Sequence, residues 1–156
     1  MSSELNIPRK EAESYINEYF AKHQKVKEFM DSLVVSAKEQ GYVTTILGRK
    51  RYIPEITASN YMVRQLGERL AMNSPIQGSA ADIIKVAMLR VYQALRDGGL
   101  KTRLILQVHD ELILEVHKDE IKEATKILRD GMEHAIKLDV KVDAALHQGE
   151  NWYDLK

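Results

Sequence analysis

The sequence predicts an α+β fold, in which a small antiparallel sheet carries helices on one face. Apolar residues recur at helical spacing in several long stretches, and apolar and polar residues alternate in short ones. From residue 59 onward these stretches follow the order helix, strand, strand, helix, strand. Three strands make a small sheet, and a helical portion precedes it.

Composition limits the class of protein. At 156 residues, the chain is long enough for one domain or for two unequal lobes. Its content of 44% hydrophobic and 29% charged residues is ordinary for a globular protein. Lys+Arg and Asp+Glu are balanced at 23 each, so a nucleic-acid site would have to arise from local clustering. The absence of Cys excludes disulfides and thiolate metal sites. We expect a cytoplasmic protein with no membrane partner, because no signal peptide and no apolar run near ~20 residues is found.

Two amphipathic stretches precede Gly41, which is a predicted helix C-cap. A polar interruption at residues 22–25 separates them, and both one bent helix and a helical hairpin fit this pattern. The aromatic residues of the first stretch are expected to pack in a core rather than to stack on bases. The apolar positions are Ala12, Tyr15, Ile16, Tyr19 and Phe20, then Val26, Phe29, Met30, Leu33, Val34 and Ala37.

Residues 42–53 are typical of a β-hairpin with its turn at Gly48-Arg49, closed by Pro54. Three consecutive basic residues, Arg49, Lys50 and Arg51, lie at its end. They would suit phosphate binding, since each neutralised phosphate releases condensed counterions. A solvated turn explains them equally well.

A long helical pattern runs from Ser59 to about Arg96, and Pro75 predicts a break or sharp kink within it. Arg69, Asn73 and Gln77 follow one another at intervals of four and therefore share one helix face. The small residues at 78–81 would permit close approach of a sheet, a second helix or a ligand.

Residues 103–116 contain two short runs in which every second residue is apolar, separated by a polar break. The apolar positions are Leu104, Leu106 and Val108 before the break and Leu112, Leu114 and Val116 after it. This pattern predicts two half-buried strands joined by a tight turn. The tip carries the adjacent carboxylates Asp110 and Glu111, and Mg²⁺ typically binds one or two carboxylates together with water and phosphates. Ordinary turn chemistry explains the His-Asp pair on its own.

The remaining residues predict one more helix and one more strand. Asp119 is the expected N-cap of an amphipathic helix with apolar positions from Ile121 to Ala135. Residues 140–146 alternate as a final strand, which would carry Asp143 on its outer face.

The block at residues 69–85, RLAMNSPIQGSAADIIK, followed by QVHDEL at 107–112, resembles the C-terminal part of family A DNA polymerases of the bacterial DNA polymerase I type. The resemblance runs from Leu5 through Trp152. It implies a partial fingers subdomain at residues 1–60, with two helices and a basic β-hairpin. The distal part of the palm would follow at residues 61–156, with the long helix packed on the sheet.

On this resemblance, the hairpin of residues 103–116 is the family's motif C. Asp110 and Glu111 are implied as catalytic, metal-binding residues for Mg²⁺, with two ions in the complete site, and His109 would lie by the primer terminus. Primer-template DNA would contact Arg69, Asn73 and Gln77 near its minor groove, and Gln107, Arg49, Lys50 and Arg51 complete the implied DNA-binding set.

The implied activity is template-directed transfer of dNTPs to a primer 3′ end in DNA replication and repair, in the nucleoid of the cytoplasm. The family's motif A aspartate and nucleotide-binding fingers helix do not occur in the sequence. We therefore expect the chain alone to be incomplete and inactive, to need the upstream part of the polymerase, and to expose an open sheet edge that favours self-association. The alternative is a non-catalytic duplex DNA-binding module.

Overall fold

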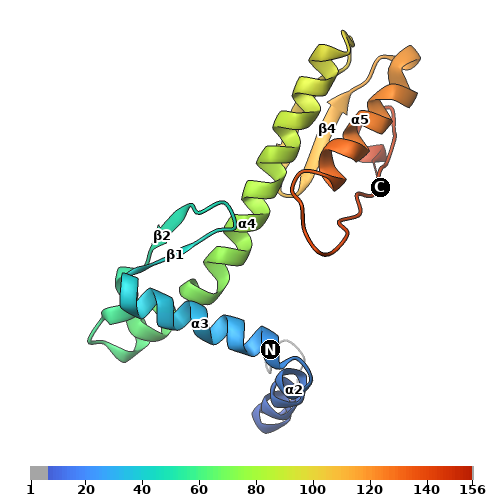
Figure 1. Ribbon diagram of the computed structural model, residues 1–156. Helices are drawn as coiled ribbons and strands as arrows, with labels where there is room; N and C mark the ends of the chain where they lie inside the picture. Colours follow the sequence, from blue (N-terminus) through green and yellow to red (C-terminus); the bar gives the residue numbers. More distant parts are fainter. Residues whose placement is uncertain (1–6, 156) are drawn as a thin grey trace. The chain divides into compact units, whose positions relative to one another are not determined.

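The computed structural model describes residues 7–155, shown in Figure 1. They form two compact units that divide between Ile76 and Gln77, inside helix α4. Each unit has its own apolar core. No helix among residues 7–155 is long and apolar enough to cross a lipid bilayer.

The first unit begins with helices α2 (Arg9–Lys22) and α3 (Gln24–Gln40), which His23 separates. Helix α3 ends at Gly41, whose φ of 76° is left-handed and whose N–H donates to the Ala37 carbonyl at 2.9 Å, so the predicted C-cap is confirmed. The prediction of core packing is wrong for Tyr15 and Tyr19, which are 53% and 51% exposed. Their helix lies outside both apolar cores, so periodicity alone did not bury them.

Strands β1 (Tyr42–Thr44) and β2 (Lys50–Tyr52) pair antiparallel and are shorter than the sequence predicts. The five residues between them form the turn, in which the Gly48 N–H donates to the Thr45 carbonyl at 2.9 Å. Because the turn begins at Thr45, Ile46 and Leu47 lie in the loop and are exposed. Gly48 has a φ of 77°, which suits glycine.

The core of the first unit consists of Ala37, Val43, Ile53, Ile56 and Ala71. Ile56 belongs to the 3₁₀ turn η1 (Pro54–Thr57) and approaches helix α4 at Gly67. A Cβ added at Gly67 would lie 2.7 Å from the Ile56 backbone nitrogen, so only glycine allows this approach.

Helix α4 runs without interruption from Tyr61 to Asp97. Asn60 caps its start, because the Asn60 Oδ1 accepts the Met62 N–H at 2.9 Å. The sequence predicts a break or sharp kink at Pro75, and the helix is not broken there. Proline removes one backbone donor, and in a helix of 37 residues the turns on both sides of Pro75 keep the segment helical.

The second unit contains the rest of α4, strands β3 (Arg103–Val108) and β4 (Glu111–Glu115), and helix α5 (Ile121–Glu133). The short 3₁₀ turn η2 (Lys118–Glu120) directly precedes α5, and a second one, η3 (Trp152–Asp154), lies near the end of the described residues. Figure 1 shows α5 beside β4, and the two elements share a core with α4. Its members are Ile84, Ala87, Val91, Leu95, Leu112 and Ala135, with Leu104 and Leu114 packed against them.

Two predictions for the C-terminal portion are wrong. Residues 140–146 form no strand, and each sheet among the described residues has two strands. Alternation marks a strand only where a neighbouring backbone supplies hydrogen bonds, and no described segment pairs with this one. Asp143 instead forms an ion pair with Lys141. Asp119 does not cap α5, because the preceding 3₁₀ turn moves the N-cap to Glu120.

Candidate functional site

The tip of the β3–β4 hairpin is a two-residue connection formed by His109 and Asp110. Val108 pairs with Glu111, so the ladder continues to the residues that flank this connection. The side chains of His109, Asp110 and Glu111 are all exposed. Two adjacent carboxylates therefore face solvent at the end of a hydrogen-bonded ribbon.

His109 has a left-handed backbone conformation in this turn. Its φ of 52° is the only positive φ of a non-glycine residue among residues 7–155. A side chain in this left-handed region costs roughly 1–2 kcal/mol. The Gln107 Nε2 donates a hydrogen bond to the His109 carbonyl at 2.6 Å, which stabilises the backbone at the tip. Such strained positions often cluster at functional sites.

A β-bulge at Ile105 changes which residues of β3 face the core. The pairing shifts between Leu104 and Leu106, so Leu104 is opposite Leu114 whereas Leu106 is opposite Ile113. Leu104 packs against the core, but Leu106 is 41% exposed. The prediction that Leu104 and Leu106 share one buried face is therefore wrong.

On β4, the expected face is found for Leu112 and Leu114, which pack in the core of the second unit. Val116 lies beyond the strand and is 37% exposed. Together with Ile105, which is 57% exposed, it leaves apolar surface on the hairpin. This finding agrees with the expected uncovered apolar surface.

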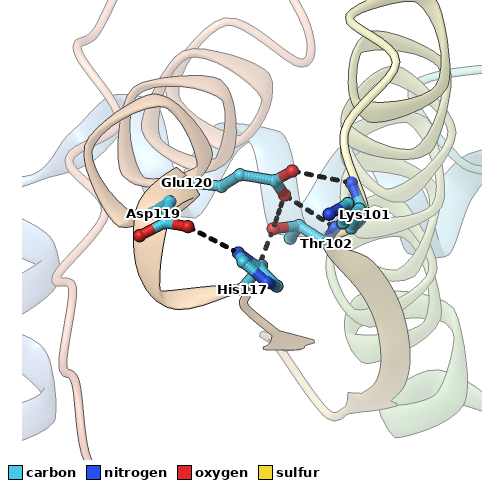
Figure 2. Close-up of polar contacts among 5 residues, drawn as sticks. All are labelled: Lys101, Thr102, His117, Asp119 and Glu120. Carbon is cyan, nitrogen blue, oxygen red and sulfur yellow. Dashed lines mark hydrogen bonds and ion pairs between the residues drawn. The ribbon is translucent and has the colours of Figure 1, made fainter.

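The open end of the hairpin is tied together by Glu120, as Figure 2 shows. Its carboxylate accepts the Lys101 N–H at 2.9 Å, the Thr102 N–H at 2.8 Å and the Thr102 hydroxyl at 2.7 Å. The Thr102 hydroxyl also accepts the His117 N–H at 3.4 Å. The residues just before β3 and just after β4 are thus joined to the start of α5.

These bonds affect the acidity of Glu120. The Lys101 N–H makes the largest contribution to lowering the pKa of this carboxyl below its ordinary value of 4.5, and the Thr102 hydroxyl adds to it. Beside it, the His117 Nδ1 lies 3.6 Å from the Asp119 carboxylate. The ionised form of Glu120 is therefore the one that holds the hairpin.

The predicted row on α4 has the expected local geometry. Arg69, Asn73 and Gln77 are exposed and lie at intervals of four along one hydrogen-bonded helix. Arg69 and Asn73 belong to the first compact unit and Gln77 to the second. The small residues at 78–81 precede the contacts of α4 with the core of the second unit, which begin at Ile83 and Ile84.

The basic residues at 49–51 are all exposed, with Lys50 and Arg51 on β2 and Arg49 in the turn. The Arg49 N–H donates to the Thr45 hydroxyl at 3.2 Å. Lys50 places its Nζ 4.2 Å from the centre of the Tyr42 ring. This hairpin therefore presents positive charge beside aromatic surface.

The tip carboxylates suit a hard cation, because Mg²⁺ prefers carboxylate oxygens and retains several waters. Among residues 7–155, no group of three or more His, Asp or Glu side chains is placed to hold a metal. Asp110 and Glu111 would therefore supply part of a coordination shell, completed by water, substrate phosphate or further protein ligands.

Comparison with known proteins decides the family. The model of DNA polymerase family A matches residues 1–154. The chain belongs to this family. DNA polymerase I of Geobacillus stearothermophilus is 51% identical over the whole chain, and that of Bacillus subtilis (strain 168) is 50% identical. The chain spans 18% of the length of each of these two relatives.

A solved structure supports membership of family A at the level of the fold. The POL domain of Pol1 from M. smegmatis, in complex with DNA primer-template and dNTP, has a TM-score of 0.95 and 44% sequence identity. The match covers 99% of this chain and 27% of that chain. The α+β class expected from the sequence and the resemblance to family A polymerases are both confirmed.

Some structural features of this family A chain were missed by sequence reasoning. The Ile105 bulge has no marker in the alternating pattern, and the Glu120 contacts join residues 18 and 19 positions apart. Gly131 is a third case, since a Cβ there would lie 2.5 Å from the Val91 Cγ2. A glycine inside an otherwise amphipathic helix was the available signal for this close approach of α5 to α4.

Proposed function

We propose that this chain supplies part of the catalytic domain of a template-directed DNA polymerase. The reaction is transfer of a deoxynucleoside monophosphate from a dNTP to a primer 3′ end, in DNA replication and repair in the bacterial cytoplasm, at the nucleoid. The observation that carries the proposal is the pair of exposed adjacent carboxylates, Asp110 and Glu111, at the tip of the β3–β4 hairpin of a family A chain.

Asp110 is the direct ligand in this proposal, and Glu111 supports the site beside it. When bound, two Mg²⁺ ions would activate the primer hydroxyl and stabilise the leaving pyrophosphate. The protein's part is to hold the carboxylates at one place, which the two-residue connection and the Gln107 bond to the His109 carbonyl favour. We place His109 by the primer terminus.

We assign residues 1–60 to a partial fingers subdomain and residues 61–156 to the distal palm. Arg69, Asn73 and Gln77 would contact the minor groove of the primer-template duplex, where Asn and Gln can bond acceptors that every correct pair presents. Gln107 would contribute from β3. The basic residues 49–51 would bind phosphates, which adds affinity without sequence preference.

We infer that residues outside this chain complete the site. Two-metal chemistry needs carboxylates from adjacent strands, and the described residues place no third acidic ligand near Asp110 and Glu111. Both DNA polymerase I relatives are much longer than the chain, which supports a contribution from the upstream part of the polymerase. The exposed hairpin face would then receive neighbouring strands, and without them it favours self-association.

A second candidate is a duplex-binding module without chemistry. The exposed row of Arg69, Asn73 and Gln77 favours it, because this row needs no metal and no further residues to contact DNA. The two proposals differ in their dependence on Asp110. Loss of that carboxylate should abolish nucleotidyl transfer and leave duplex binding nearly unchanged.

The test is primer extension by a chimera in which these 156 residues replace the matching segment of the Geobacillus stearothermophilus polymerase. We expect the chimera to extend a primer with Mg²⁺ and dNTPs. Asp110→Ala should slow extension at least about a hundredfold, since a metal site is worth several kcal/mol in the transition state. The matched control is Asp139→Ala, which removes an exposed carboxylate far along the sequence.

Equal extension by the Asp110→Ala and Asp139→Ala chimeras would exclude Asp110 as a metal ligand. An inactive chimera that still binds duplex DNA would favour the binding module. The isolated chain should not extend a primer, and extension by it would show that a second carboxylate comes from this chain or from another copy.

A further inference from the structure

We propose that the outer face of the β1–β2 hairpin binds an unpaired nucleotide of a DNA strand, with Tyr52 as the ring on which the base stacks. This inference rests on the proposed function and names a further contact for the template. It concerns the first compact unit alone. The residues that carry it are Tyr42, Lys50 and Tyr52.

The pairing register places the two tyrosines and the lysine on one face of the hairpin. Tyr42 pairs with Tyr52 and Thr44 with Lys50, whereas the intervening pair is Val43 with Arg51. Side chains alternate between the faces of a strand, and Val43 is 3% exposed in the core of the unit. Tyr42, Tyr52 and Lys50 therefore lie on the outward face.

Tyr52 is held by Tyr42 and still open to a ligand. The two ring centres lie 5.6 Å apart at an interplanar angle of 64°, an edge-on contact that orients the Tyr52 ring. Lys50 places its Nζ 4.2 Å from the centre of the Tyr42 ring, so Tyr42 already has a cation on it. Tyr52 is 67% exposed, and its ring is the one available for stacking.

The charge around this ring matches a phosphate backbone. Residues 42–53 contain three basic residues and no acidic one. Lys50 is exposed on the face of β2 that carries Tyr52 and forms no ion pair with a described carboxylate. A nucleotide stacked on Tyr52 would have its phosphates within the positive field of the Lys50 side chain.

The aromatic ring selects for an unpaired strand. Bases inside a duplex stack on one another and offer no free face, so a duplex would use only the cations of this surface. An unpaired base can stack on an exposed tyrosine whatever its identity. Such indifference to sequence is what a surface for a template strand requires.

The test compares two single strands of about 12 nucleotides, a typical length for one binding module, by fluorescence anisotropy with the 156-residue chain. One strand is oligothymidine and the other has the same phosphates with abasic sites. Stacking predicts that oligothymidine binds at least about fivefold more tightly than the abasic strand. This comparison uses the parent chain and needs no variant.

Variants then assign the preference to Tyr52. Tyr52→Leu should lower oligothymidine affinity to that of the abasic strand, and Tyr52→Phe, which keeps the ring, should retain the preference. Lys50→Gln should weaken the binding of both strands equally. It should also reduce the salt dependence of the affinity by roughly one phosphate contact. The control is Tyr92→Leu, which removes a 52% exposed tyrosine from α4 and should leave the preference unchanged.

Equal affinity for the two strands, or no binding of either, would overturn the inference, as would a preference that survives Tyr52→Leu. A surface that binds by charge alone would also bind an acidic peptide, and it would give equal affinity for the two strands. The proposed function is judged separately, by extension in the chimera and its loss in Asp110→Ala. An active chimera with no strand preference in the isolated chain would reject only the role of Tyr52.

Discussion

Glu120 and Thr102 are joined by two hydrogen bonds, from the Thr102 N–H at 2.8 Å and from its hydroxyl at 2.7 Å. Thr102 is 4% exposed, so its polar groups depend on this carboxylate rather than on water. The pair connects the loop before β3 to the start of α5, and therefore fixes the base of the hairpin that carries Asp110.

Glu120→Gln should lower the urea midpoint of the chain at pH 7, because the amide cannot accept three hydrogen bonds as a carboxylate does. The pKa of Glu120 is lowered in the folded protein, so its stabilising effect is present above the ordinary pKa of 4.5 and is lost as pH falls through the folded value. Parent and variant should therefore converge at low pH. Urea unfolding followed by circular dichroism at pH 7, 5 and 3 measures this.

Glu123→Gln is the matched control for Glu120→Gln, since Glu123 is exposed on α5 and has no such partners. It should change the midpoint much less. A constant difference between Glu120→Gln and the parent at all three pH values would contradict the assigned role of the ionised carboxylate.

Gly131→Ala should destabilise the second unit although alanine favours helices. The added Cβ would lie 2.5 Å from the Val91 Cγ2, and Val91 is fully buried. Overpacking of this kind costs about 1–3 kcal/mol, against a gain in helix propensity of about 1 kcal/mol. Thermal unfolding of Gly131→Ala, Val91→Ala and the double variant forms a cycle. The double variant should lose less unfolding free energy than the sum of the losses in the two single variants. Additive losses would show that the added Cβ does not press on Val91.

His109→Gly should stabilise the hairpin by about 1 kcal/mol, since glycine adopts a φ of 52° without the strain of a side chain. His109→Val should destabilise it, because a β-branched residue is especially disfavoured there. The control is Asp110→Gly, at the other residue of the turn, where φ is not positive and glycine brings only flexibility. Denaturant unfolding compares the three, and a loss of stability in His109→Gly would argue against the left-handed turn.

Ile105→Lys should reduce self-association of the isolated chain with little effect on its folding, because Ile105 is 57% exposed at the bulge. Multi-angle light scattering and binding of an apolar dye measure the two effects. Leu112→Lys is the contrasting variant: Leu112 is 8% exposed in the core, and a charge there should unfold the second unit. Unchanged association in Ile105→Lys would show that another surface drives it.

The sequence by itself determined the helical stretches, the α+β class, the hairpin that carries His109, Asp110 and Glu111, and the family. Periodicity reports burial along one segment, and the long matched blocks are specific to family A polymerases. The roles of individual site residues remain predictions. Local patterns were less successful in two places: Asp119 lies in a 3₁₀ turn rather than at the N-cap of α5, and Pro75 does not break α4.

Only the tertiary structure decided the bulge at Ile105, the Glu120 contacts and the absence of a strand at residues 140–146. Each depends on two segments at once. A bulge reflects how many residues one strand sets against its neighbour, a hydrogen bond between distant residues requires both to be placed, and an alternating segment becomes a strand only beside an available backbone. A pattern within one segment records its own burial but carries no information about the backbone that will lie beside it.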